Sequence, residues 1–439
     1  MQFDHVGERD VSTVSSRQSG TPESCRPRVG FVTESFLEES GAMLEGGAER
    51  HLLHLASVAV AVGADVTVYQ RGKPGVDRFV DGIRVVSLPT PLVRLGRTLG
   101  DRAVADGCTH LHFQYLERVP WSMHQVPMTA TAHALYWDIP YDHRYYKWYP
   151  GQRLAAAYLP AWRYHQLSRS LLAVGRCRRV LATDTSLLRL VQSVRPALRH
   201  RVDVVKNFTD LLEDRTATHA SAEADPALAL LVESRRAGHT VVLVPRNLSF
   251  VRGGAWLCEV VERTTAMLPQ GRACHFFLTG VPIDVYGRAA TYRRLLEQHI
   301  NAMSAEGRRR LHLLSGLPRA SMAAAYQASD IVLIPTFANE GTSLAALEAL
   351  GFGVPLVATA VGGLNDIVQD GVTGLLVTPE PTAIARGVAV LAEDAELRAR
   401  LGDAGRQMVT AAFTYERWAV RAEGFARRAG WAADGETGT

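Results

Sequence analysis

Lysine is nearly absent from this 439-residue chain, which has only Lys73, Lys147 and Lys206. Arginine therefore supplies almost all of the positive charge, and the formal net charge is only +4. No run of basic residues is long enough to form a nucleic-acid-binding arm, so nucleic acid is not an expected partner. Arginine forks suit two-pronged contacts with phosphate, but a compositional bias toward alanine and arginine is the simpler explanation of their number.

Cysteine is also scarce and shows no pattern typical of a metal site. The five cysteines are Cys25, Cys108, Cys177, Cys258 and Cys274. None forms a Cys-x-x-Cys pair, and histidine spacing adds no zinc pattern, so no metal is expected. An odd, scattered set is typical of a reducing compartment, which predicts a cytoplasmic location.

Long apolar runs are missing too. No run reaches the ~18–20 residues of a membrane span. Residues 1–27 lack the apolar core of a signal peptide, and we interpret them as a disordered tail. With 47% hydrophobic residues, the rest of the chain can bury sizeable cores, and its length suggests two or three domains.

After residue 27, short apolar strands alternate with helical patterns. Strands are predicted in "RVGFVT", "DVTVYQ", "THLHFQYL" and "PMTATAHAL", and a helix is predicted from Gly46–Gly47. The polar, alanine-rich stretch 213–239 is typical of a linker. Alternation then restarts with "TVVLVPRNL" and continues through "DIVLIPT", "VPLVATAV" and "TGLLVTP". This pattern predicts an α/β fold with two doubly wound, Rossmann-like domains, at 28–212 and 240–410, that face a central cleft. Residues 411–439 are assigned to a terminal helix and tail.

Two glutamates stand eight positions apart in "NEGTSLAALEAL". Glu340 is predicted at the carboxyl end of a strand, where open α/β sheets bind ligands. A helix is expected to begin near Thr342 or Ser343, so its free N–H groups form a candidate phosphate site. Glu348, expected about two turns into that helix, could accept two hydrogen bonds from a ribose diol. A pair of ordinary helix charges is the alternative, but an acid flanked by leucine and alanine is costly to bury without a partner.

Two loops could supply further groups to the cleft. In "VPRNLSFVRGG", Arg246 and Arg252 could clamp a diphosphate before a helix that opens near Gly253. Two solvated arginines are an equally weighted alternative. In "LEGGAER", Gly46 and Gly47 permit close approach of an anion or acceptor, or they mark a simple loop-to-helix transition.

His133 is predicted at a strand end facing the same cleft, and its position alone makes it a candidate. The aromatic and basic stretch 136–170 has three interpretations, in order of preference. It is a packed insertion, a contact for the acceptor, or a surface that docks on a membrane. Peripheral membrane contact therefore stays open as a partner prediction.

These motifs, taken in order, resemble the retaining glycosyltransferases of family 4, which have the GT-B fold. The resemblance rests on the Glu-x7-Glu pair and on the downstream "GVPLVATAVGGLNDIVQDGVTGLLV". Weaker support comes from "GGAER", from "VVKNFTD", which keeps Asn207 and Asp210 of the family's turn, and from "FTYERWAVRAEGF", which is similar to a terminal helix that crosses back to the first domain. It covers most of residues 28–428.

The resemblance implies a role for each candidate. The first domain would bind the acceptor and the second a nucleotide-sugar. Glu340 would bind donor-sugar hydroxyls and Glu348 the ribose, while His133 would contact the sugar near the anomeric carbon. The remaining implied donor contacts are Gly47, Gly341, Thr342, Ser343, Leu344 and the backbone of Leu317.

Two positions depart from the family pattern. Thr342-Ser343 replaces a usual Phe-Gly pair, so the family's contacts to the donor sugar differ there. In the phosphate clamp, Asn247 stands in the arginine register, Arg246 lies one position early and Arg252 replaces lysine. We assign the clamp to Arg246 and Arg252.

The predicted function is metal-independent transfer, with retention, of a hexosyl group of glucose or N-acetylglucosamine type. The donor is a nucleotide diphosphate sugar, with UDP favoured by family frequency, and no cofactor is expected. The acceptor is a hydroxyl on a small glycoside, cyclitol, natural product or lipid-linked saccharide. Two alternatives stay open: a sugar-nucleotide epimerase of the same fold, and a non-catalytic nucleotide-sugar-binding protein. Oligomeric state is not predicted.

Overall fold

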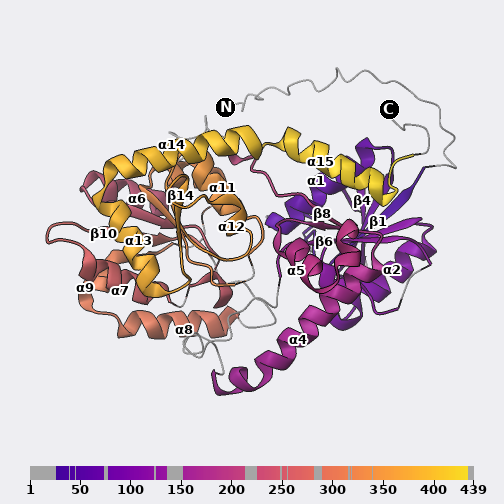
Figure 1. Ribbon diagram of the computed structural model, residues 1–439, viewed down its shortest axis with the longest axis horizontal. Coiled ribbons are helices and arrows are strands. Elements are labelled where there is room, and N and C mark those ends of the chain that lie inside the picture. The colour runs from indigo at the N-terminus through magenta and orange to yellow at the C-terminus, as the bar shows by residue number, and fades with distance from the viewer. Residues whose placement is uncertain are drawn as a thin grey trace, which may run out of the picture.

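The computed structural model describes residues 26–38, 40–44, 46–73, 78–122, 125–135, 152–212, 225–247, 250–254, 256–280, 289–314, 317, 319–338 and 340–433. The chain forms two α/β halves joined along one side by the last two helices (Figure 1). The predicted tail at 1–27 lies almost wholly outside the described residues, and so do 136–151 of the aromatic stretch.

The first half is built on an eight-stranded sheet with the order β3-β4-β2-β1-β5-β6-β7-β8. All neighbouring pairs are parallel except β3 with β4. The strands are β1 (Arg28–Thr33), β2 (Asp65–Arg71), β3 (Arg78–Val80), β4 (Ile83–Leu88), β5 (His110–Phe113), β6 (Met128–Ala132), β7 (Arg179–Ala182) and β8 (Val202–Val204). The α-helices are α1 (Gly47–Ala61), α2 (Leu95–Ala105), α4 (Gln152–Arg176) and α5 (Ser186–Val194), and the 3-10 turns are η2 (Leu92–Arg94), η3 (Leu116–Arg118) and η4 (Pro196–Arg201).

The second half has a six-stranded, all-parallel sheet with the order β11-β10-β9-β12-β13-β14. Its strands are β9 (Thr240–Val244), β10 (Cys274–Leu278), β11 (Leu311–Leu313), β12 (Ile331–Ile334), β13 (Leu356–Thr359) and β14 (Gly374–Val377). Its helices are α6 (Pro226–Arg236), η6 (Phe250–Arg252), α7 (Leu257–Met267), α8 (Ala289–Ala302), α9 (Ala305–Arg310), α10 (Arg319–Gln327), α11 (Leu344–Gly351), α12 (Leu364–Ile367), α13 (Pro381–Glu393) and α14 (Ala395–Ala412). The central strands are continuous apolar runs because helices cover both faces of the sheet.

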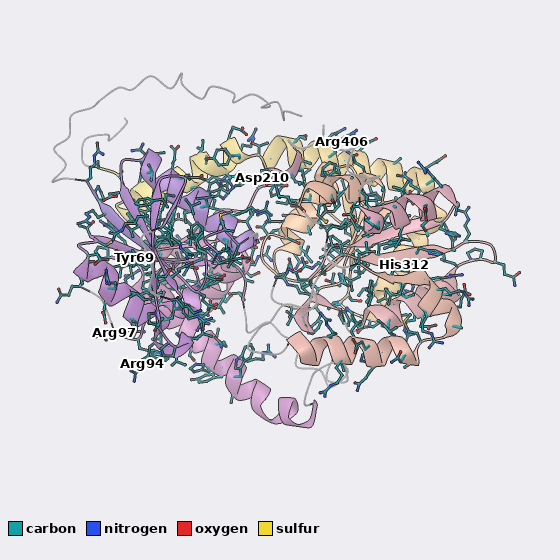
Figure 2. All side chains as sticks on the ribbon, turned by 180° about the vertical axis from the view of Figure 1, so that it is seen from behind. Tyr69, Arg94, Arg97, Asp210, His312 and Arg406 are labelled. Carbon is teal, nitrogen blue, oxygen red and sulfur yellow. The ribbon has the colours of Figure 1, made fainter. Side chains whose placement is uncertain are left out.

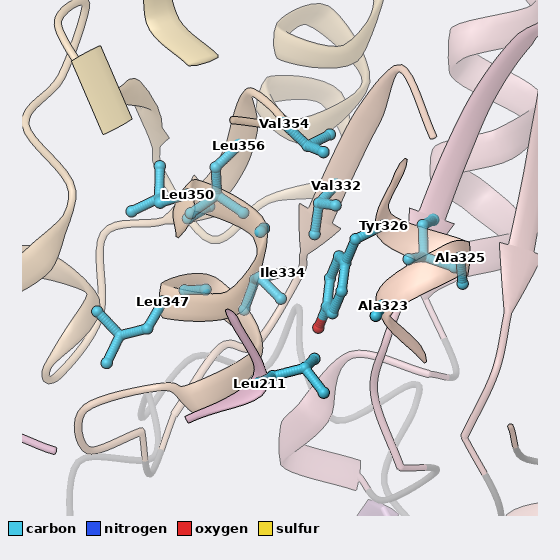
Figure 3. Packing of buried hydrophobic residues seen from close by; sticks show 14 of the residues in the cluster. Leu211, Ala323, Ala325, Tyr326, Val332, Ile334, Leu347, Leu350, Val354 and Leu356 are labelled. Atoms are coloured by element: carbon cyan, nitrogen blue, oxygen red, sulfur yellow. The ribbon is translucent and has the colours of Figure 1, made fainter. Parts of the chain in front are cut away.

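Apolar side chains from α10, α11, β12 and β13 fill one face of the second sheet (Figure 3). Leu211, which follows the first half in sequence, packs into this cluster. The last helix, α15 (Tyr415–Ala429), returns to the first half, where Trp418 and Phe425 join the core beneath β1 and α1. The two halves therefore share a connection at each end of the second domain.

The fold confirms the predicted α/β class with two parallel sheets, and it corrects several local expectations. The stretch 213–239 is not only a linker, because 226–236 form α6. Asp225 caps that helix, Pro226 opens it, and Leu228 and Leu231 enter the second core. No strand was predicted between Gln70 and Thr109, but β3 and β4 occupy part of that stretch, where a half-exposed edge gives a weak pattern.

The loop after β9 was also predicted wrongly. The helix expected near Gly253 begins only at Leu257. Gly253 instead turns the chain with φ at +80°, and a side chain there would meet the carbonyl oxygen of Pro335 at 2.2 Å. The domain boundaries as a whole stay a prediction.

Candidate active site

Glu340 follows β12 and is buried between two arginines. Arg252 Nη1 donates to Glu340 Oε2 over 2.6 Å, and Arg246 Nη2 donates to the same oxygen. Burial opposes ionisation, but the two guanidinium groups outweigh it and hold the pKa of Glu340 below its usual value. The carboxylate is therefore charged at neutral pH, and the trio carries a net charge of about +1.

The two arginines differ in how far their side chains are exposed to solvent. Arg246 is buried, and it also donates to Thr336 Oγ1 over 2.9 Å and to Ser343 Oγ over 3.4 Å. Burial, together with the neighbouring Arg252, lowers the pKa of Arg246 to about 10, so it stays protonated at neutral pH. The side chain of Arg252 is 34% exposed, so this guanidinium is the one that can turn toward a ligand.

Three glycines let the loop after Glu340 pack backbone against backbone. A side chain at Gly341 would lie 1.8 Å from the carbonyl oxygen of His133 in the first domain. Gly362 packs against the carbonyl oxygen of Glu340, and Gly363 packs against that of Gly341, so neither position has room for a side chain. The Gly363 N–H also donates to the Glu340 carbonyl oxygen over 2.8 Å. The Gly-Gly turn that was quoted for the family resemblance therefore supports the backbone of the Glu340 loop.

The residues between the two glutamates form the start of α11. Ser343 is the N-cap but its side chain caps no N–H, so the first N–H groups of the helix lack that partner. Thr342 Oγ1 donates to the carbonyl oxygen of Thr183 in the first domain, so this hydroxyl serves contact between the domains. Leu344 opens the helix opposite Gly47, where a side chain would meet Leu344 Cδ1 at 3.0 Å.

Glu348 is the fifth residue of α11, a little over one turn into the helix rather than the predicted two. Its Oε2 accepts a hydrogen bond of 2.9 Å from the phenol of Tyr326, and Oε1 lies 3.9 Å from Arg319 Nη1. Burial raises the pKa of Glu348, while Tyr326 opposes that rise.

Glu348 lies at the edge of a partly open cavity between the domains. The lining residues come from α1, from the connection after β8, and from α11: Gly47, Arg50, His51, His54, Asn207, Phe208, Asp210, Leu344 and Glu348. Asp210 pairs with Arg50 at 3.6 Å and with Arg319 at 2.5 Å, so it links both domains at the rim; Figure 2 shows its position between the two halves.

His133 follows β6 and faces the second domain. Its Nε2 lies 3.0 Å from Gln114 Nε2, and its ring meets that of His51 edge-on at 5.0 Å. Burial lowers the pKa of His133 to about 4, so the ring is neutral at neutral pH.

Hydrogen bonds hold the two domains together around this point. Asp366 accepts from Thr185 N and from Thr185 Oγ1, each over 2.7 Å. Lys206 Nζ donates to the Asp366 carbonyl over 3.0 Å, and Asn207 Nδ2 donates to the Thr342 carbonyl over 3.3 Å. Of the predicted site residues, Gly47, Leu344 and Glu348 line the cavity, while Gly341 packs against the His133 backbone across the domain boundary.

Leu317 is half-buried against the second core, and its sequence neighbours 315, 316 and 318 lie outside the described residues. Gln114, Tyr326, Arg319 and Asp366 were not predicted as site residues. Gln114 directly follows the buried strand β5, and Tyr326 lies in the alanine-rich helix α10. The one signal in the sequence that could have indicated them is a polar side chain among residues expected to be buried.

Within the part of the chain that the structure describes, no group of three or more histidine, cysteine, aspartate or glutamate side chains is placed to hold a metal ion. Of the described helices, none is both long and apolar enough to cross a membrane.

Comparison with known proteins places this cleft in context. Residues 285–408 match the family described as "Glycosyl transferases group 1". D-inositol 3-phosphate glycosyltransferase from Corynebacterium glutamicum (strain R) is 25% identical over 404 residues, which cover 84% of this chain and 88% of that protein. The enzyme of the same name from Mycolicibacterium gilvum is 27% identical over 397 residues, with coverage of 84% and 82%.

Solved structures show the same fold. Sucrose-phosphate synthase from Thermosynechococcus elongatus superposes with a TM-score of 0.69 at 20% identity, covering 92% of this chain and 99% of that one. Anabaena HepE in complex with UDP and glucose superposes with a TM-score of 0.63 at 18% identity, covering 92% and 100%.

Proposed function

Because the chain is a glycosyltransferase of group 1 with the family 4 type of GT-B fold, we propose that it transfers a hexosyl group from a UDP-sugar to a hydroxyl acceptor with retention of configuration. The observation that carries the proposal is the trio of the buried Glu340 and Arg246 with the half-buried Arg252 at the carboxyl end of β12, next to the start of α11. The trio offers a carboxylate for sugar hydroxyls from the loop after β12 and cations for a diphosphate from the loop after β9.

The donor would lie along the start of α11. The ribose diol would bind Glu348 at the cavity rim. The diphosphate would meet the N–H groups from Gly341 to Leu344, where the helix dipole favours an anion. Arg252 would turn to the diphosphate and stabilise charge on the leaving group, which is the electrostatic part of catalysis.

The sugar would lie between Glu340 and His133. A neutral His133 adds no positive charge beside an anomeric carbon that becomes cationic. No side chain is assigned as a covalent nucleophile. The leaving phosphate would instead take the acceptor proton, on the face from which it departs, and this reaction would proceed without a metal.

The acceptor would enter from the first domain. The relatives named above are D-inositol 3-phosphate glycosyltransferases, and this favours a cyclitol or small glycoside over the other predicted acceptors. We also propose a cytoplasmic location, because an odd number of scattered cysteines is typical of a reducing compartment.

A donor screen tests the proposal. Thermal shift with UDP- and GDP-sugars identifies the donor, and mass spectrometry with a cyclitol and glycoside panel identifies the product. NMR of the new glycosidic bond then reports its configuration, and an inverted anomer would refute retention. Epimerisation of a UDP-sugar without acceptor would indicate the epimerase instead, and binding without transfer or hydrolysis would indicate a non-catalytic protein.

A further inference from the structure

Gln114 lies directly after β5, and its side chain is buried at the carboxyl edge of the first sheet. Its Nε2 donates to the carbonyl oxygen of Ala48 in α1 over 2.7 Å and lies 3.0 Å from His133 Nε2. One amide nitrogen thus touches a carbonyl oxygen and an imidazole nitrogen at once.

This geometry determines which ring nitrogen of His133 holds the proton. The opposite orientation of the amide would set an oxygen 2.7 Å from the Ala48 carbonyl, where two acceptors repel, so the amino group must lie there. The amino group has two hydrogens, one for the Ala48 oxygen and one for His133. His133 Nε2 therefore accepts a hydrogen bond, and the proton of the neutral ring is on Nδ1.

A second observation shows that this arrangement has a cost. Gln114 Oε1 is buried without a hydrogen-bond partner in the described part of the chain. An unsatisfied buried polar atom is destabilising and calls for an explanation such as a functional role. A leucine would fill similar space at no such cost, but it could not orient the imidazole.

We propose that Gln114 is a positioning residue that holds His133 as the neutral tautomer with its proton on Nδ1, so that Nδ1–H is the donor offered to the bound sugar. In the described part of the chain, Nε2 is the ring nitrogen with a side-chain partner, and the ring also interacts with the Gln114 backbone. Nδ1–H would then meet a ligand hydroxyl or ring oxygen. The part of the inference that concerns the sugar rests on the proposed function, whereas the tautomer does not.

The tautomer can be measured directly. In protein labelled with ¹⁵N-histidine, two-bond ¹⁵N–¹H correlation spectra distinguish Nδ1–H from Nε2–H, and a His133→Asn variant assigns the signals. We expect Nδ1–H in the unmodified protein. His112 is an internal control, because its two nitrogens lie 3.0 Å from Thr129 Oγ1 and Thr131 Oγ1 and should not respond to changes at Gln114.

Two substitutions then perturb the amide. In Gln114→Glu, the carboxyl oxygen that replaces Nε2 brings at most one hydrogen, which the Ala48 carbonyl oxygen takes. This oxygen can then only accept from His133, so Nε2 should become protonated. In Gln114→Leu, neither tautomer is favoured and a mixture should appear. With an identified donor, turnover should fall by about tenfold or more in both variants, since an imidazole held in the wrong tautomer loses its role, while KM for the donor changes less.

The outcomes separate this inference from the proposed function. Nε2–H in the unmodified protein, or an unchanged tautomer in Gln114→Glu with intact His112 signals, would overturn the inference. Full turnover in a variant whose tautomer has switched would overturn the functional part of it. The predicted tautomers in a protein that transfers no sugar would support the positioning and refute the proposed function alone.

Discussion

Replacing Tyr326 with phenylalanine removes one oxygen atom from the second domain and leaves a fully buried ring in place, among the residues of Figure 3. That oxygen donates the 2.9 Å hydrogen bond to Glu348 Oε2. A hydrogen bond to a charged group contributes about 1.5–3 kcal/mol, and one between neutral groups about 0.5–1.5 kcal/mol. The cost of Tyr326→Phe should therefore depend on whether Glu348 is ionised.

The direction of the pH dependence follows from burial, which raises the folded-state pKa of Glu348 above its unfolded value. Ionising this carboxyl in the folded protein costs stability, and the cost appears as pH rises above the unfolded value. Without the phenol, the pKa rises further and the cost grows. Urea unfolding should show a loss of about 1.5–3 kcal/mol near pH 7.5 and a smaller loss of about 0.5–1.5 kcal/mol near pH 4.

The same change should weaken donor binding, because a protonated or misdirected Glu348 accepts fewer hydrogen bonds from a ribose. We expect the calorimetric Kd of UDP-glucose to rise about tenfold, which corresponds to about 1.4 kcal/mol. Tyr164→Phe is the matched control, since Tyr164 is 73% exposed on α4. Equal stability and equal Kd in Tyr326→Phe and the unmodified protein would refute this account of Glu348.

Three further substitutions probe the site. Gly341→Ala places a Cβ 1.8 Å from the His133 carbonyl oxygen, so kcat/KM should fall about a hundredfold while circular dichroism shows that the fold is retained. Gly175→Ala is the control, because its nearest contact is at 3.8 Å and kcat/KM should not change. Normal activity in Gly341→Ala would show that the domains need not approach this closely. Glu340→Gln leaves Arg246 buried without its counter-charge and should cost about 3–5 kcal/mol in urea unfolding as well as transfer activity; a variant that is active and equally stable would contradict the trio. Asp366→Ala removes two hydrogen bonds to Thr185, so small-angle scattering without nucleotide should show a larger radius of gyration, and an unchanged radius would exclude Asp366 as a domain contact.

The sequence predicted the features that depend on local pattern. Strands buried on both faces, such as β9 and β12, read as continuous apolar runs, and a parallel sheet places Glu340 at its carboxyl edge. The helix start beside Glu340, where the Ser343 side chain caps no N–H, follows from the same logic.

Pairings between distant side chains could not be predicted in this way. Gln114 reaches His133 across 19 positions, Tyr326 reaches Glu348 across 22, and Thr185 reaches Asp366 across 181. Each pairing arises only when sheets and helices pack, so no local periodicity records it. Thr342 is an instructive case, because its hydroxyl contacts the first domain, while its expected contact with the donor sugar stays a prediction.

A crystal structure of the protein with a bound UDP-hexose tests the central claim most directly. The account predicts the ribose hydroxyls on Glu348, the diphosphate at the N–H groups of Gly341 to Leu344 with Arg252 turned toward it, and the hexose between Glu340 and His133. A nucleotide bound outside this cleft, or a ribose that makes no contact with Glu348, would contradict it.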